Sequence, residues 1–300
     1  MKKLKIIFKY RWIAMFVIIW ILIYQSINRL ELVREIQRAL PSREAGLLAG
    51  MVWGEKRGIS SDFYKLLINT GLIHIVVVSG ANLMIVGRNL IELLAKILGR
   101  KKAIAGGAGV ILIYVNSIGW QIPIIRAVLF LSVYYLAQIL GRQFNKKRAI
   151  VLVGLLMTMA DVGVLRDVSF WLSMAAFVAI TLNQRGGIIK NTVWVSLFVL
   201  PILSISFGKI SLFTPITNIA VLFLVEILTV MGLIGSLTMT VCHDLGMVIL
   251  AITYPLLRYL IEMVEKIGGI GGVINFKFNW WMLVGWYLMI GGYWYEKKTV

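Results

Sequence analysis

The amino-acid sequence predicts an all-α protein, a polytopic membrane helix bundle of about nine to ten transmembrane spans with amphipathic interfacial helices. The first observation is composition. Of the 300 residues, 60% are hydrophobic and only 15% are charged, which is too little polar material to cover a soluble core. The second is a succession of apolar runs close to the roughly 20 residues that a spanning helix needs. The third is that basic residues gather in alternate loops between these runs.

In chain order, the apolar runs predict spans at residues 12–27, 71–87, 103–119, 123–140, 148–164, 168–184, 191–207, 213–241, 245–265 and 279–295. The first follows a basic stretch and precedes polar, bulky residues, so it predicts an uncleaved span and not a signal peptide. The run at 213–241 is long enough to be tilted or broken. The run at 245–265 is amphipathic in its second half, which leaves open whether it spans the membrane or lies in the interface.

Lysine and arginine total 31 against 13 acidic residues, a net charge of +18. With the N-terminus in the cytoplasm, the predicted inner loops at 88–102, 142–148 and 185–190 hold 11 basic residues, whereas the short outer loops hold few. This asymmetry follows the positive-inside rule, which is the simplest interpretation of the charge. The alternative is a polyanionic ligand, either nucleic acid or an anionic lipid headgroup.

Residues 28–70 are too polar to cross a membrane and are predicted to lie on its outer side. Apolar side chains recur there at the spacing of an amphipathic helix: Leu30, Val33, Ile36 and Leu40. Pro41 is expected to end this helix, and residues 61–62 to begin another. We therefore divide the chain into 1–44, a first span with an outer amphipathic helix, and 45–300, a domain that holds the other predicted spans.

No pattern of a catalytic site is present. The sequence has no Walker A loop, no HExxH helix and no GxSxG turn. Its histidines are His74 and His243 and its cysteine is Cys242, which cannot build a closed zinc site without several carboxylates. We predict that the protein is not an enzyme and has neither a cofactor nor a metal.

Polar residues at membrane depth are the candidates for a transport path. Ser79, Gly80 and Asn82 follow an apolar stretch and fall roughly 12–17 Å into the predicted span at 1.5 Å per residue. Such a cluster can leave helical geometry and expose backbone groups to a cavity. The alternative is that Gly80 permits close helix packing while Ser79 bonds to its own helix.

A second group of polar residues falls at the outer rim in this topology. His74 lies near the start of its span, Arg126 follows a proline at the start of another, and Asp167 and Ser173 open a third. Their shared depth is consistent with a single mouth. Snorkelling of Arg126 to the interface is the alternative.

Five runs carry a resemblance to a known family, in the same order along the chain: 47–60 (LLAGMVWGEKRGIS), 71–86 (GLIHIVVVSGANLMIV), 123–127 (PIIRA), 167–176 (DVSFWLSMAA) and 214–226 (TPITNIAVLFLVE). They resemble the signature segments of the ComEC-type competence proteins, which form the inner-membrane DNA channel of bacterial natural transformation. The resemblance is clearest over residues 45–235. Where many members have a second histidine, this chain has Asn82, which still offers a donor and an acceptor.

The resemblance implies a multi-pass channel in the cell inner membrane that translocates single-stranded DNA into the cytoplasm. With the polar positions above, it implies these candidates for the DNA path or pore: His74, Ser79, Gly80, Asn82, Arg126, Asp167 and Ser173. It implies single-stranded DNA and membrane lipid as partners, together with an outer DNA receptor and a cytoplasmic motor. Larger members carry an OB-fold and a metallo-hydrolase-like domain, whose patterns we do not find, so we expect a minimal member.

Two other classes of function stay open. One is a small-solute or lipid transporter that uses a broken helix at residues 79–82. The other is a structural membrane subunit that scaffolds partners. Salt distinguishes a DNA channel from a solute transporter, because DNA binding weakens steeply as salt rises and binding of a neutral solute does not.

Overall fold

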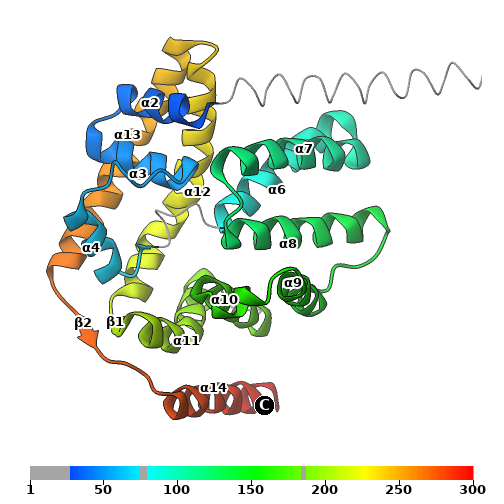
Figure 1. Cartoon of the computed structure of the whole chain (residues 1–300), viewed down its shortest axis with the longest axis vertical. Coiled ribbons are helices and arrows are strands. Elements are labelled where there is room, and N and C mark those ends of the chain that lie inside the picture. The colour runs from blue at the N-terminus through cyan, green and yellow to red at the C-terminus, as the bar shows by residue number, and fades with distance from the viewer. Residues whose placement is uncertain (1–27, 74–79, 184–186, 300) are drawn as a thin grey trace, which may run out of the picture.

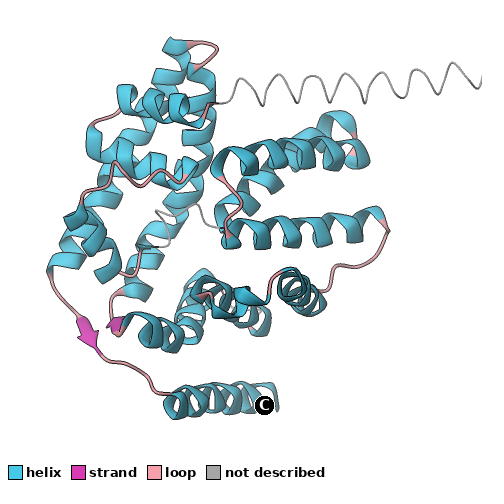
Figure 2. Cartoon of the chain, in the orientation of Figure 1, coloured by secondary structure: helices cyan, strands magenta, loops and turns pink. Residues whose placement is uncertain are grey.

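The computed structural model describes residues 28–73, 80–183 and 187–299. Within them the fold is all-α apart from two three-residue strands, as predicted (Figure 1, Figure 2). The α-helices are α2 (Arg29–Ala39), α3 (Ser42–Trp53), α4 (Ser61–Asn69), α6 (Gly80–Leu98), α7 (Arg100–Ile118), α8 (Ile122–Ile139), α9 (Lys146–Ala160), α10 (Val168–Leu182), α11 (Ile188–Phe207), α12 (Thr214–Met239), α13 (His243–Gly269) and α14 (Trp280–Thr299). A 3-10 helix, η1 (Val162–Arg166), and the strands β1 (Lys209–Ser211) and β2 (Val273–Asn275) complete the set.

A long helical hairpin of α12 and α13 forms one side of the molecule (Figure 1). The helices have 26 and 27 residues, about 40 Å each at 1.5 Å per residue, so both exceed the ~30 Å of a bilayer core. The sequence left open whether residues 213–241 are broken, and α12 is continuous. It also left open whether residues 245–265 span, and α13 is long and apolar enough to do so.

Three short helices, α2, α3 and α4, pack on this hairpin (Figure 1). The helix α3 is buried at every position from Glu44 to Trp53, and the Trp53 indole donates a hydrogen bond of 3.2 Å to the Ser236 hydroxyl of α12. The predicted boundary between residues 44 and 45 falls inside α3, and dividing the chain there stays a prediction.

The amphipathic helix predicted after residue 28 is α2, and it ends before Pro41 as expected. One position of its buried stripe was wrong. Leu30 is 50% exposed and Leu32 is buried in its place, because α2 turns the face that carries Leu32, Val33 and Ile36 toward α3 and α12. The sequence pattern gives the spacing of such a stripe but not which of two overlapping faces the neighbours cover.

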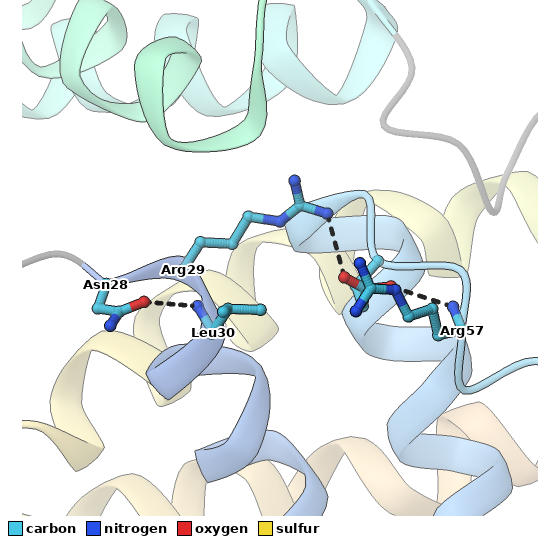
Figure 3. A network of polar contacts seen from close by, with 5 residues as sticks. Asn28, Arg29, Leu30 and Arg57 are labelled. Carbon is cyan, nitrogen blue, oxygen red and sulfur yellow. Dashed lines mark hydrogen bonds and ion pairs between the residues drawn. The ribbon is translucent and has the colours of Figure 1, made fainter.

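Side-chain caps explain where α2 and α4 begin. The Asn28 side chain caps α2 by accepting a hydrogen bond from the backbone N–H of Leu30 at 3.1 Å (Figure 3). From the same end, Arg29 reaches the Glu55 carboxylate at 3.4 Å, which ties α2 to the turn after α3. Ser60 caps α4, within one residue of the predicted start.

The charged half of α13 faces other helices. Arg258 lies 3.7 Å from the buried carboxylate of Glu44 in α3, and Glu265 forms an ion pair of 2.6 Å with Arg43. Glu262 pairs instead with Arg258 and Lys266 of α13 itself, so two of the four charges in this half, Arg258 and Glu265, have a partner on α3.

One predicted loop was wrong, because α6 and α7 occupy nearly all of it. Residues 88–102 were expected to be an inner loop, but α6 continues to Leu98 and α7 begins at Arg100, so only Gly99 separates them. Basic side chains do not stop a helix; they only end its apolar stretch. The break falls at Gly99 because its φ of +75° is a left-handed conformation that glycine adopts without strain.

The helices α8, α9 and α10 pack together around a second apolar cluster, which includes Phe130, Val153, Met157 and Phe170. The span predicted at 148–164 was too long: α9 ends at Ala160 after 15 residues, about 22 Å, and η1 follows. The strands β1 and β2 pair antiparallel and were not predicted.

Four helices in the described residues are long and apolar enough to cross a membrane: α8, α11, α12 and α13. A fifth, α10, is apolar but shorter. The chain is therefore a multi-pass membrane protein. The span predicted at 12–27 lies outside the described residues, and a total of about nine to ten spans stays a prediction.

Candidate functional site

The N-terminal end of α8 holds a buried arginine. Pro123 lies in the first turn, where the missing backbone N–H disrupts no helical hydrogen bond, and Arg126 follows in the second. Arg126 is only 5% exposed. Its Nη1 donates a hydrogen bond of 3.1 Å to the carbonyl oxygen of Ser169 in α10. The guanidinium is therefore turned toward a neighbouring helix, not extended to the interface as a snorkelling side chain would be.

The N-terminal end of α10 supplies the partners. The Asp167 carboxylate caps α10, accepting a hydrogen bond from the Phe170 backbone N–H at 3.1 Å and another from the Ser169 hydroxyl. The Ser173 hydroxyl donates a hydrogen bond of 2.9 Å to the carbonyl of Ser169. Arg126 and Ser173 thus share one acceptor, and three positions that the sequence placed at a common rim meet around Ser169.

The surroundings of the Arg126 guanidinium explain how its charge is stabilised although the side chain is buried. A guanidinium taken out of water costs several kcal/mol unless polar and charged partners compensate it. Here the Asp167 carboxylate acts electrostatically on Arg126, and a helix N-terminus favours that negative charge. The arrangement braces α8 against α10 through a charge-assisted hydrogen bond. At 5% exposure, the guanidinium is a link between helices and not an open phosphate site.

Gly80, at the start of α6, lies against the same end of α8. A Cβ added to Gly80 would stand 2.6 Å from the Pro123 carbonyl oxygen and 3.2 Å from the Cβ of Ala127. The first distance is shorter than real Cβ contacts, so only glycine allows this approach. Three of the runs that carry the family resemblance therefore meet here, through Gly80, Pro123 with Arg126, and Asp167.

Asn82 points elsewhere. It is buried, and its Nδ2 donates a hydrogen bond of 3.3 Å to the Met51 carbonyl in the last turn of α3. The Tyr114 hydroxyl of α7 donates one of 2.6 Å to the next carbonyl, that of Val52. The last carbonyls of a helix have no partner within it, so these two side chains satisfy groups that would otherwise be buried unpaired.

Of the seven candidate residues, the structure brings four together: Gly80, Arg126, Asp167 and Ser173. Asn82 is close to them in sequence but bonded to α3. His74 and Ser79 lie outside the described residues, so the predicted break at 79–82 is not tested. A role in a DNA path stays a prediction for each of the seven.

Sequence reasoning missed Ser169, the residue on which the cluster converges. Its contribution is a backbone carbonyl, which any residue type provides, so composition gave no signal. A signal did exist in the spacing, because Asp167 and Ser169 at a helix start, with Ser173 four residues further on, form a capping pattern on one helical face.

Opposite this cluster, the far end of α8 is basic. The Arg100 guanidinium donates two hydrogen bonds, of 3.0 and 2.7 Å, to the Gln138 side-chain oxygen, so the turn between α6 and α7 lies beside the end of α8 (Figure 1). Exposed basic residues gather on the segments that meet here: Lys96, Arg100, Lys101, Lys102, Arg142, Lys146, Lys147 and Arg148. Two of the predicted inner loops thus lie at the same end of the molecule.

The residues of the described site position helices relative to one another. Both serine hydroxyls donate to acceptors of their own helix, and the one carboxylate is engaged as a cap. Within residues 28–73, 80–183 and 187–299, no group of three or more His, Cys, Asp or Glu side chains is placed to hold a metal ion. What these residues can do is hold three helix ends in register at one end of α8.

Comparisons with known proteins place this geometry in context. A family model described as Competence protein matches residues 51–299. An uncharacterised protein of Aquifex aeolicus (strain VF5) is 29% identical over 153 residues, which are 50% of this chain and 36% of that protein. The chain thus spans little more than a third of the length of that relative. No solved structure matches the chain.

Proposed function

Because the chain belongs to the competence protein family, we propose that it is an inner-membrane channel that passes single-stranded DNA into the cytoplasm during natural transformation. Membership of the family suggests a role in DNA uptake. The channel, its substrate form and its direction are the proposal, and they rest on the family match together with the arrangement of the two ends of α8.

One observation carries the proposal beyond the family. The helix α8 has 18 residues, about 27 Å, close to the thickness of a bilayer core. Three runs that resemble family motifs meet at its first end, and two basic segments meet at its last. By the positive-inside rule the basic end faces the cytoplasm. The family motifs then lie at the outer mouth, and the DNA would leave toward a positively charged face.

This arrangement suits the binding of a polyanion such as single-stranded DNA without recognition of its base sequence. Nonspecific binding of single strands depends on positive charge that follows the phosphate backbone. The exposed lysines and arginines at the cytoplasmic end would supply that charge, while Arg126 holds the mouth in shape. With no ATP-binding loop in the sequence, force comes from a separate cytoplasmic motor, and an outer receptor delivers the DNA.

Substitution of Arg126 tests the proposal. We expect Arg126→Ala to reduce uptake of labelled DNA, per molecule of membrane-inserted protein, by roughly tenfold, which corresponds to about 1.4 kcal/mol. Arg126→Lys should recover little, because an ammonium cannot reproduce the planar guanidinium that donates to the Ser169 carbonyl from within a buried site. Arg34→Ala removes the same charge from an exposed position on α2 and serves as the control.

The result that would overturn the proposal is equally specific. If cells carrying a complete deletion of the chain still take up labelled DNA at the normal rate, the protein is not the channel. If only the Arg126 variants import normally while the deletion does not, the channel stands and the mouth lies elsewhere.

A further inference from the structure

An apolar groove of about 240 Å³ lies between α7 and α8, with α6 at its base. Its floor is buried: Ile91, Ile104 and Leu131 are each at most 6% exposed. Its rim is open, since Leu136 is 53% exposed. The helix α8 is long and apolar enough to cross a membrane, and in a spanning α8 this opening would face lipid acyl chains.

A polar group inside the groove has no partner. Tyr135 lines the groove and is 5% exposed, yet its hydroxyl makes no hydrogen bond within the described residues. Buried hydroxyls are almost always paired, and an unpaired one costs about 1–3 kcal/mol. The Tyr135 hydroxyl is therefore a buried donor without a partner among the described residues, on a side chain that lines the groove.

The same end of the groove is positively charged. The Arg100 guanidinium lies 5.7 Å from the centroid of the Tyr135 ring, and its two hydrogen bonds go to the neutral oxygen of Gln138. The nearby carboxylate of Glu92 is hydrogen-bonded to Arg88 at 2.8 Å. Arg100 thus keeps donors and charge available beside the groove.

We propose that this groove binds an anionic phospholipid, with one acyl chain between α7 and α8 and the phosphate against Arg100 and the Tyr135 hydroxyl. The three features match the three parts of such a lipid: an open apolar channel, a buried donor and a fixed cation. Basic pockets between spanning helices on the cytoplasmic side are a recurrent way of binding anionic headgroups. The proposal does not depend on DNA transport and concerns a different part of the chain from the mouth.

Retention of lipid by the purified protein tests it. The full chain is reconstituted in an equal mixture of phosphatidylglycerol and phosphatidylcholine, extracted in mild detergent and examined by native mass spectrometry. We expect one phosphatidylglycerol to be retained at least about tenfold more often than phosphatidylcholine. Tyr135→Phe and Arg100→Gln should each reduce this preference several-fold, and Ala108→Phe, which fills the groove, should abolish retention of both lipids.

Matched controls separate the site from general effects. Arg34→Gln removes one exposed charge on α2, and Ala105→Phe adds the same ring to an exposed position on α7 that does not line the groove; both should retain lipid normally. Tyr135→Phe keeps the test decisive if Ala108→Phe fails to fold, because the Tyr135 hydroxyl makes no hydrogen bond within the described residues.

Three outcomes would overturn the proposal. The first is equal retention of the two lipids by the unaltered protein. The second is displacement of the retained lipid by millimolar inorganic phosphate, which would assign Arg100 to a free anion. The third is a dimer that Ala108→Phe dissociates without any lipid preference, which would make the groove a contact between two copies of the chain.

Discussion

At the scale of single residues, buried polar side chains in this protein act on backbone carbonyls. Arg126 and Ser173 donate to the carbonyl of Ser169, while Asn82 and Tyr114 donate to carbonyls at the end of α3. In lipid, water cannot satisfy such groups, so each helix end that is buried must find donors on a neighbour. Arg126, Asn82 and Tyr114 therefore join helices that apolar packing alone would leave free to slide, whereas Ser173 bonds within α10.

Two tyrosines of different environment test this view. Tyr114→Phe removes the hydroxyl that donates to the Val52 carbonyl and should lower the free energy of unfolding by about 1–3 kcal/mol. Tyr135→Phe removes an equally buried hydroxyl that has no protein partner, so in lipid-free detergent it should be neutral or slightly stabilising. Denaturant unfolding of both variants in the same detergent measures the difference. Equal stability of the two would contradict the role assigned to the α3 carbonyls.

At the scale of helices, the sequence predicts where apolar runs lie better than where helices end. The apolar runs that form α12 and α13 were predicted because both are long and bounded by polar residues, although the sequence left open whether the second one spans the membrane. The end of α6 was wrong because Arg88 and Lys96 end an apolar run without ending a helix. The burial of α3 could not be predicted, since a segment of 12 residues is too short to register as a span and its neighbours come from distant parts of the chain.

Topology is the prediction that belongs to this scale. Reporter fusions after Lys102, Arg148 and Lys190 should report the cytoplasm, and fusions after Gln121 and Val164 the outside. The bonds between Arg100 and Gln138 support the first pair, because they hold two of the basic segments at one end of the molecule. Alkaline phosphatase and a cytoplasmic reporter at the same positions give complementary signals. Inverted labelling at any two of them would exclude the layout and the placement of Arg126 at an outer mouth.

At the scale of the whole molecule, the candidate site was predicted in part. Arg126, Asp167 and Ser173 were placed together because their spans begin on the same side, and α8 and α10 do bring them together. Ser169 was missed because every residue has a backbone carbonyl, so the residue type does not show which carbonyl will accept a hydrogen bond. The net charge of +18 was interpreted first as topology. Eight of the exposed basic residues gather at one end of α8, and the proposed function would give them a use in binding DNA.

That use predicts a salt dependence. Binding of single-stranded DNA by the purified protein should fall about 10²- to 10³-fold between 50 and 200 mM salt if roughly six phosphates are contacted. Replacing Lys146, Lys147 and Arg148 by glutamine should make the logarithmic slope shallower by about 2, at about 0.7 per phosphate. Arg34→Gln should leave it unchanged. Fluorescence anisotropy measures each slope, and binding that is flat with salt would favour the small-solute transporter instead.

The complete burial of α3 has a consequence for how the protein is made. Trp53 finds its hydrogen-bond partner at Ser236, 183 residues later, and Thr70 has its carbonyl bonded by Thr217 across 147. At 5–20 residues per second, the ribosome needs about 10 to 40 s to supply the first of these partners. Throughout that interval a helix too short to span the bilayer is already synthesised but cannot dock. We therefore expect truncation before α12 to leave this segment without its partners and to turn a stable protein into a substrate for membrane proteases, which pulse-chase labelling of the truncated and full chains measures.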